Sequence, residues 1–204
     1  MLNEQQLVSE TDSFTEKRYH QFSRFIPSSS RAVSILDIGC NTGRGGRVLR
    51  RMFPNAHLTG IDVVENRLKI IPQGLYDALM VGSITRIALP DASLDFILAG
   101  EVIEHISPAD LSVVLCELRR VLKPSGKLLM TTPNPESFLV KAGRDHVFQD
   151  PSHLSIMPIG IHKNLLHECG FTTIKIFGSG KAIRIFPHWF PLMGVFGSYL
   201  SVSC

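Results

Sequence analysis

The 204-residue sequence carries few of the signals that mark metal-binding or redox proteins. It contains no CxxC pair and no Cys/His spacing of a metal site, so its cysteines are interpreted as small apolar fillers in a reducing compartment. The four cysteines are Cys40, Cys116, Cys169 and Cys204. We therefore expect a cytoplasmic protein without a bound metal.

Charge of one sign and long hydrophobic runs are missing as well. Lysine and arginine total 21 against 18 acidic residues and are scattered, so no nucleic-acid partner is expected. The N-terminus is polar and lacks the basic start and apolar core of a secretory signal. The apolar stretch 185–202 is broken by two prolines before the ~20 residues of a membrane span accumulate.

The composition is that of a globular protein, with 44% hydrophobic and 19% charged residues. The length suits one full domain. Spaced apolar residues between Asn3 and Phe25 predict one or two helices, so residues 1–30 are assigned as an N-terminal helical extension of a domain at 31–204. The stretch 133–158 lacks clear periodicity, as functional loops often do.

Short apolar runs alternate with helical periodicity after the extension. Most of these runs are nearly continuous, which is typical of parallel strands buried on both faces. The predicted strands are 33–39, 57–63, 77–84, 94–100, 126–133, 171–178 and 197–204. The sequence thus predicts an α/β fold with a single Rossmann-like, doubly wound, seven-stranded sheet, mostly parallel with an antiparallel last strand.

Two of the intervening helices have readable boundaries. One is predicted to begin with Ser107 as its cap and Pro108 in its first turn, and to stop at the KPSG stretch, 123–126. The buried face of a later helix is predicted to hold Ile161, Leu165, Leu166 and Cys169. Three histidines without carboxylates at ligand spacing are expected on the surface of that helix or in the tail, with no metal role: His162, His167 and His188.

The stretch ILDIGCNTGRGG, residues 35–46, places four glycines behind an apolar run that ends in a carboxylate. In open α/β sheets, ligands lie outside the carboxyl ends of the strands, and glycines after the first strand let the backbone approach them. Asp62 follows Gly43 by 19 residues, which fits a carboxylate that accepts ribose hydroxyls. Asp37 favours a positively charged sulfonium, because a pyrophosphate there would be repelled.

In their order along the chain, these motifs resemble the class I S-adenosylmethionine-dependent methyltransferases. The resemblance is to the small-molecule branch (methyltransferase type 11) that includes the ubiquinone and menaquinone pathway enzymes. It covers about residues 35–135 through ILDIGCNTGRGG, TGIDVVENRL, GSI, LPDASLDFILAGEVIEHI and LRRVLKPSGKLLMTTPNP. It implies S-adenosyl-L-methionine as the cofactor. The cofactor-binding set that it implies is Asp37, Gly39, Cys40, Asn41, Gly43, Asp62, Val63, Gly82, Ser83, Ile84 and Glu101.

By that resemblance, Asp62 would hold the ribose, Ser83 would border the adenine and Glu101 would lie beside the reactive methyl. Two positions depart from the family pattern. Asn41 replaces the middle glycine of GxGxG, which is tolerable because asparagine accepts left-handed backbone angles. Ser83 replaces the acid that commonly binds the adenine amino group, so cofactor affinity is expected to be weaker.

Methyl transfer from a sulfonium requires alignment, exclusion of water and, for an O–H acceptor, removal of a proton. The candidate catalytic residues are Glu101, His105 and His153. Glu104 and His105 could instead merely cap or solvate the next turn, without a catalytic role. His153 lies in DPSHLSIMP, which is similar to a segment over the active-site mouth of methyltransferases encoded with polysaccharide and lipid-linked glycan pathways. Alternatively, His153 is a structural residue whose ring hydrogen-bonds to a loop carbonyl.

The predicted activity is S-adenosylmethionine-dependent methylation of a small-molecule acceptor, with O-methylation of a sugar, glycan intermediate or quinone-like compound favoured. The segment FPHWFPLMG, 186–194, could line an apolar acceptor site, make a peripheral membrane contact, or simply pack. A non-catalytic S-adenosylmethionine-binding regulator and a nicotinamide-dependent oxidoreductase remain as alternatives. The oligomeric state is not predicted.

Overall fold

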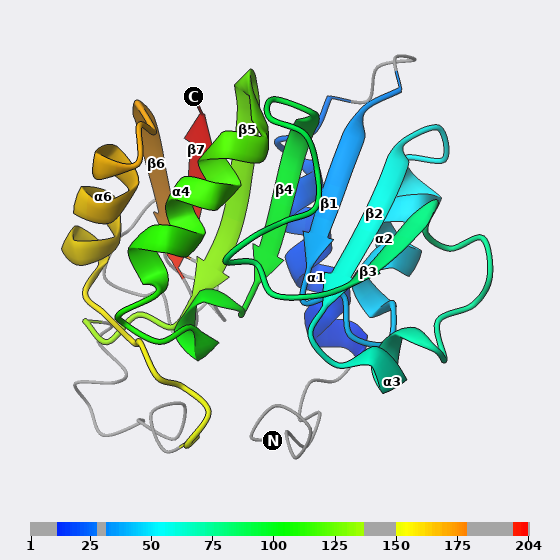
Figure 1. Ribbon diagram of the computed structural model, residues 1–204, viewed down its shortest axis with the longest axis horizontal. Coiled ribbons are helices and arrows are strands. Elements are labelled where there is room, and N and C mark those ends of the chain that lie inside the picture. The colour runs from blue at the N-terminus through cyan, green and yellow to red at the C-terminus, as the bar shows by residue number, and fades with distance from the viewer. Residues whose placement is uncertain (1–11, 28–31, 137–149, 179–197, 204) are drawn as a thin grey trace, which may run out of the picture.

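The computed structural model describes residues 12–27, 32–136, 150–178 and 198–203. They form one sheet with the strand order β3-β2-β1-β4-β5-β7-β6 (Figure 1). The strands are β1 Ser34–Ile38, β2 His57–Asp62, β3 Ala78–Val81, β4 Leu94–Gly100, β5 Leu122–Thr132, β6 Thr173–Gly178 and β7 Ser198–Ser203. Strands β1 to β5 pair in parallel, and β7 pairs antiparallel with β5 and β6. The prediction of a Rossmann-like α/β fold is confirmed.

Helices cover both faces of the sheet, which explains why its central strands are apolar throughout (Figure 1). They are α1 Asp12–Ser23, α2 Arg44–Met52, α3 Glu65–Leu68, the 3₁₀ helix η2 Ile103–His105, α4 Leu111–Val121 and α6 Ile159–Glu168. One core packs α4 and α6 on the sheet, and a second packs α1 and α2 on it. The strand order reverses between β1 and β4, so the carboxyl ends of these two strands flank the usual ligand crevice of such folds.

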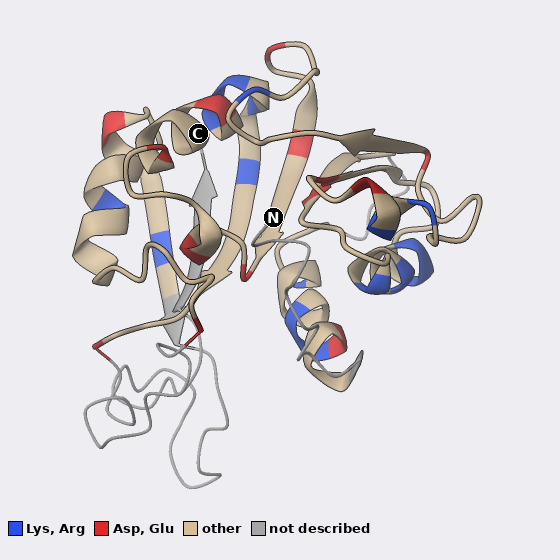
Figure 2. Ribbon diagram, turned by 60° about the horizontal axis from the view of Figure 1, so that its bottom comes forward, with Lys and Arg blue, Asp and Glu red and all other residues tan. Residues whose placement is uncertain are grey.

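Helix α1 is an integral part of the domain core. Tyr19 and Phe22 are buried in the same cluster as Ile35 of β1 and Leu49 of α2. The basic residues of α2, coloured blue on the ribbon at the right of Figure 2, also contribute to the fold. Arg50 donates to the carbonyls of nearby loops and to Asp77, and thereby ties α2 to the loops that flank β2.

The boundaries of α4 differ from the prediction at both ends. The helix begins at Leu111 with Asp110 at the N-cap, because Ser107 instead closes a turn by accepting the N–H groups of Ala109 and Asp110. It ends at Val121 because Leu122 is already extended and pairs with Leu94 of β4. The KPSG stretch therefore lies within β5, at a shift in register, and does not act as a helix stop. The buried face of α4 is apolar throughout, as its sequence spacing indicates.

The buried face of α6 also departs from the prediction. Leu166 is fully buried as expected, but Ile161 is exposed and His162 is 0% exposed. The expectation of a surface His162 is therefore wrong, and the helix is rotated so that this ring faces the core. Neither ring nitrogen of His162 has a partner among the described residues, and burial lowers the pKa of the ring. His167 is exposed, and His188 lies outside the described residues.

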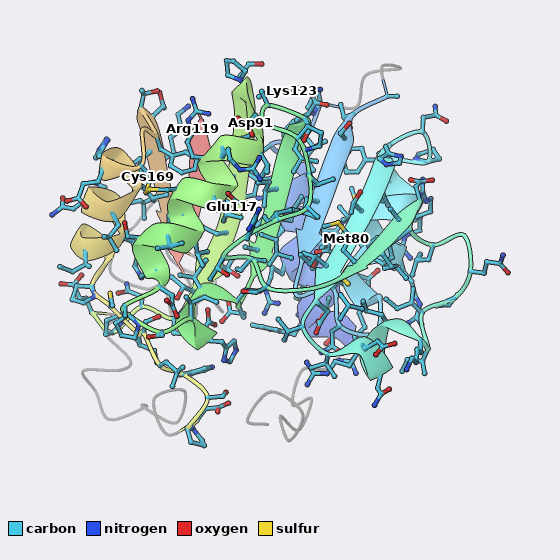
Figure 3. All side chains as sticks on the ribbon, viewed as in Figure 1. Met80, Asp91, Glu117, Arg119, Lys123 and Cys169 are labelled. Carbon is cyan, nitrogen blue, oxygen red and sulfur yellow. A yellow bond between two sulfur atoms is a disulfide. The ribbon has the colours of Figure 1, made fainter. Side chains whose placement is uncertain are left out.

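The interpretation of every cysteine as a filler is wrong for one pair. Cys116 of α4 and Cys169, directly after α6, form a disulfide with their Cα atoms 4.7 Å apart. Figure 3 shows Cys169 between the two helices. The packing of α4 on α6 joins residues 53 positions apart, and spacing along the chain gives no sign of this pairing. Cys40 is buried and free, whereas Cys204 lies outside the described residues. The cytoplasmic location stays a prediction.

The segment 186–194, for which an apolar acceptor site, a peripheral membrane contact and simple packing are the alternatives, lies outside the described residues. No helix in the described part of the chain has the length and apolar character that crossing a bilayer requires.

Breaking the disulfide should lower stability without changing the fold. The bond closes a loop of 53 residues, and we expect Cys169→Ser to lower the free energy of unfolding by about 2 to 4 kcal/mol. Urea denaturation with and without dithiothreitol measures this. The reductant should destabilise the wild type to the same extent and leave the variant unchanged; equal responses of the two proteins would contradict the prediction.

Candidate functional site

The turn between β1 and α2 has the backbone conformation that its sequence predicts. Gly39, Asn41 and Gly43 have φ values of 66°, 49° and 82°, all in the left-handed region. The expectation that Asn41 tolerates such angles is confirmed. A Cβ at Gly39 would lie 2.9 Å from Cγ2 of Val102, so only glycine lets these two loops approach each other. Cys40 is buried beneath the turn, and burial raises the pKa of its thiol.

Asp62, the last residue of β2, holds this turn in place. Its Oδ2 accepts the N–H of Asn41 at 2.9 Å, and its Oδ1 accepts the N–H of Val64 at 2.9 Å. A carboxylate has about four acceptor sites, so two remain for the hydroxyls of a ligand. Asp62 can therefore position the glycine turn and bind a ribose at the same time.

Asp37 at the end of β1 is enclosed more tightly than the sequence indicates. Tyr19 donates its hydroxyl to Oδ1 at 2.5 Å, and Tyr76 donates its hydroxyl to Oδ2 at 2.6 Å. The carboxyl is 1% exposed, and burial raises its pKa to about 6. A direct contact between Asp37 and a cationic ligand, as expected from the sequence, would require a tyrosine to leave.

The last two glycines of the motif explain how the tyrosines reach Asp37. A Cβ on Gly45 would lie 2.0 Å from Cζ of Tyr19, and one on Gly46 would lie 2.4 Å from Cζ of Tyr76. Only hydrogen atoms fit in these gaps. Gly45 and Gly46 are thus needed by the protein's own aromatic rings. Gly39 and Gly43 combine a close side-chain neighbour, Val102 and Leu75 respectively, with a left-handed backbone conformation.

The loop after β3 lies next to the end of β2. Gly82 donates its N–H to the carbonyl of Asp62, and there is open space beside its Cα. Val63 is 50% exposed, and Ile84 is buried behind it in the sheet core. Val63 and Gly82 leave an open apolar surface suited to a flat ring. The hydroxyl of Ser83 lies 2.9 Å from Oγ1 of Thr85 and accepts the N–H of that residue, so its hydrogen-bonding capacity is already partly used.

Glu101 follows β4 in a left-handed conformation with φ 55°. Its N–H is held by the carbonyl and hydroxyl of Thr131 on β5. Its carboxylate lies 3.9 Å from the buried guanidinium of Arg18, which also donates to the carbonyl of Gly100. A Cβ on Gly100 would lie 2.6 Å from Cδ of Arg18. The position of Arg18 beside Glu101 could not be predicted from the sequence, because no local pattern links Arg18 to Gly100, 82 positions away.

A second cluster lies next to Glu101, where η2 meets the segment 150–155. The backbone carbonyl of Glu104 accepts the N–H groups of Leu154 and Ser155 at 2.7 and 3.0 Å. Nδ1 of His105 lies 3.0 Å from the carbonyl oxygen of Ser152. These bonds bring the rings of His105 and His153 to 4.8 Å between centroids. Two of the three predicted catalytic residues, His105 and His153, are therefore neighbours, and Glu101 lies beside the same cluster.

Burial dominates the electrostatics of this cluster. The Glu104 carboxyl is 0% exposed, and burial together with the charge of Glu101 raises its pKa well above the usual range. No donor among the described residues reaches either of its carboxylate oxygens. Burial also lowers the pKa of His105. The capping or solvating role left open for Glu104 does not fit a side chain in this position.

Other charged groups lie away from this edge and are paired with one another. Arg120 of α4 binds Glu117 and the exposed Asp91, and Lys123 binds Asp95. Of these residues, Asp91, Glu117 and Lys123 are labelled in Figure 3. Asp91 precedes β4, at the end of the strand opposite Glu101. It provides a control position remote from the candidate site.

Comparison with known proteins agrees with this geometry. Residues 36–130 match the family described as "Methyltransferase domain". O-methyltransferase rstn1 of Aspergillus nomiae is 30% identical over 164 residues, which cover 72% of this chain and 68% of that protein. The demethylmenaquinone methyltransferase of Listeria welshimeri is 30% identical over 105 residues, 48% of this chain and 44% of that protein. The chain thus spans about half the length of the Listeria enzyme.

Solved structures show the same fold. A SAM-dependent methyltransferase from Archaeoglobus fulgidus matches with a TM-score of 0.71 at 21% identity, over 92% of this chain and 93% of that one. Phosphoethanolamine N-methyltransferase 2 of Haemonchus contortus, solved with S-adenosyl-L-methionine, matches with a TM-score of 0.67 at 19% identity, over 84% of this chain and 44% of that one.

The buried Asp37 should make stability depend on pH. Because its folded pKa of about 6 lies above the ordinary 3.8, the folded state keeps a proton that the unfolded chain releases, and stability falls as pH rises between these values. At 1.36 kcal/mol per pKa unit, the loss is on the order of 3 kcal/mol. We expect urea denaturation from pH 4 to 7 to show a fall that is smaller in Asp37→Asn than in the wild type by about this amount, because Glu104, whose pKa is also raised, contributes to the fall in both proteins. A difference between the two proteins that stays constant with pH would contradict the prediction.

Proposed function

The chain belongs to the class I S-adenosylmethionine-dependent methyltransferases, and from this premise we propose that it methylates a small-molecule acceptor at the carboxyl edge of its sheet. The observation that carries the proposal is the conjunction at that edge of Asp62, the left-handed glycine turn that it holds, and Glu101 on the neighbouring strand. These residues come from β1, β2 and β4, which meet at the point where the strand order reverses.

The described residues fit the cofactor S-adenosyl-L-methionine. We propose that Gly39, Cys40, Asn41 and Gly43 contact its methionine part, since their backbone is the most closely approachable at this edge. The free acceptor sites of Asp62 would bind the ribose hydroxyls. The adenine would lie against Val63, Gly82, Ser83 and Ile84. Asp37 would act through Tyr19 and Tyr76, fixing the turn without direct contact.

The bound cofactor supplies an electrophilic methyl group, so the protein must align the acceptor and remove its proton. Glu101, His105 and His153 surround the place where an acceptor would meet that methyl. Burial keeps His105 in its neutral form, which leaves one imidazole nitrogen with a lone pair. We propose that the two imidazoles serve the acceptor and that Glu101 lies beside the methionine part.

We further propose that the acceptor atom is oxygen, in a sugar, glycan intermediate or quinone-like compound. A neutral imidazole such as that of His105 suits an acceptor that must lose a proton as it reacts. The similarity to an O-methyltransferase and to a demethylmenaquinone methyltransferase supports the same choice.

Loss of Asp62 should weaken cofactor binding. Hydrogen bonds to a charged group contribute about 1.5 to 3 kcal/mol, so we expect Asp62→Ala to raise the Kd for S-adenosylmethionine by about 10- to 100-fold. Isothermal titration with S-adenosylmethionine and S-adenosylhomocysteine measures the change. Asp91→Asn, at the opposite end of the strands, should bind as the wild type does. Stabilisation by NAD(H) in place of these ligands would refute the assignment.

If the imidazoles act on the acceptor and not on the cofactor, removing one of them should change kcat but not the affinity for S-adenosylmethionine. His153→Ala should lower kcat by about 100-fold or more while leaving the Kd for S-adenosylmethionine unchanged. Turnover is followed as S-adenosylhomocysteine release and as a methylated product by mass spectrometry, with hydroxyl and amine acceptors compared. The matched control is His20→Ala, which removes a half-exposed histidine of α1. Cofactor binding without product from any acceptor would indicate a non-catalytic binding protein.

A further inference from the structure

Three potential metal ligands converge beside Glu101. One ligand atom from each of Glu104, His105 and His153 lies within 4.8 Å of the other two. Neighbouring ligands of one metal ion lie roughly 3 to 3.5 Å apart, because their bonds to nitrogen and oxygen are about 2.0 to 2.2 Å long, so these side chains would have to close in by about 1 Å around an ion. The sequence predicted no metal, because these donors come from two segments 48 positions apart and show no recognisable spacing.

The Glu104 carboxyl is the strongest indication of a missing positive partner. It is fully buried, and no donor in the described part of the chain reaches either oxygen. Burial and the charge of the neighbouring Glu101 carboxylate raise the pKa of Glu104, and the protonated carboxyl can share its proton with Glu101. A buried carboxyl in such surroundings is costly to ionise unless it is paired or coordinates a metal. The charge of Arg18 acts on Glu104 as well, but its guanidinium donates to the carbonyl of Gly100 and faces Glu101.

The orientation of His105 is that of a metal ligand. The carbonyl oxygen of Ser152, 3.0 Å from Nδ1, can only accept a hydrogen bond, so Nδ1 carries the proton. In the neutral ring, Nε2 then holds the lone pair. Histidines that bind metals usually donate their other nitrogen to a carbonyl or carboxylate in this way. For His153, the carboxylate of Asp150 lies 4.0 Å from Nε2, close enough to influence the orientation of the ring.

The backbone around the cluster is held firmly. Ser155 donates its hydroxyl to the carbonyl of Ile103 at 2.9 Å, in addition to the bonds between Glu104 and the segment 150–155. Asp150 accepts the N–H and hydroxyl of Ser152 and so fixes the turn that presents His153. The backbone that carries the three side chains is therefore held by bonds of its own, and Nδ1 of His105 is held by the carbonyl of Ser152.

We propose that Glu104, His105 and His153 bind one divalent transition-metal ion. Two imidazoles and one carboxylate suit ions of intermediate softness, such as Zn²⁺, Co²⁺, Mn²⁺ or Fe²⁺, better than Mg²⁺ or Ca²⁺. Three protein ligands leave at least one coordination position open. The ion would neutralise Glu104 and offset its repulsion by Glu101.

The place of the ion gives it a task in methyl transfer, and this part of the inference rests on the proposed function. With the ion bound, His105 and His153 serve the acceptor as ligands of that ion and not as proton acceptors. A hydroxyl of the acceptor would bind at the open position, where the positive charge lowers its pKa. Its proton passes to solvent water, the oxygen forms a bond to the methyl carbon, and the bond between that carbon and sulfur breaks. The acceptors that fit best are compounds with two adjacent oxygen atoms, because these can chelate the ion.

The binding step is tested without turnover. The full-length protein, freed of any affinity tag and dialysed against EDTA, is titrated with Co²⁺ and followed by the visible absorption of the ion and by calorimetry. We expect one equivalent to bind to the wild type and to His20→Ala. Glu104→Gln and His153→Ala should bind at least about 100-fold more weakly, since even changes to outer partners of metal ligands weaken binding by 10- to 100-fold.

Two outcomes would overturn the metal site. One is the absence of a Co²⁺ spectrum in the wild type, and the other is equal binding by Glu104→Gln, whose glutamine keeps the shape of the side chain. A thermal melt of each metal-free variant shows that it is folded, so that loss of binding is not loss of structure.

Turnover distinguishes this inference from the proposed function. If both are right, EDTA removes product formation, Zn²⁺, Co²⁺ or Mn²⁺ restores it, and the Kd for S-adenosylmethionine stays unchanged throughout. Product formation that is insensitive to EDTA would refute the metal and leave the methyltransferase. Metal binding without cofactor binding would refute the proposed function and leave the site.

Discussion

The cofactor side of this protein depends on one buried carboxyl, that of Asp37, and on the two phenols that enclose it. Tyr19 comes from α1 and Tyr76 from the loop before β3, so the pair joins segments on either side of β1. Their approach is possible only because the first turn of α2 carries Gly45 and Gly46. The glycine turn therefore depends on a contact within the protein, and each glycine of the motif is closely approached by one of the protein's own side chains.

Residues that follow parallel strands are the part of the site that a sequence reveals best. The carboxyl ends of β1, β2 and β4 meet at one edge, so Gly39, Asp62 and Glu101 could be placed together from the strand pattern alone. The left-handed conformation of Asn41 could be predicted for the same local reason. Such features depend on the order of the secondary-structure elements and on backbone angles, and both can be predicted from hydrophobic patterns and from the positions of glycine and asparagine.

Contacts between distant segments were not predictable from spacing. Arg18 reaches Glu101 because of the way α1 crosses the end of β4, and the rotation of α6 decides that His162 is buried. The disulfide between Cys116 and Cys169 depends on the same helix packing. Each of these depends on how a helix is oriented against the sheet. Hydrophobic periodicity specifies that orientation only to within a residue or so around the helix.

The two carboxylates that border the ligand crevice are linked through consecutive residues of one helix. Arg18 faces Glu101 and Tyr19 bonds Asp37, although these partners belong to β1 and to the end of β4. A small sliding of α1 would therefore alter the surroundings of Glu101 and of Asp37 at once. Helix α1 thus couples the carboxyl ends of β1 and β4 mechanically.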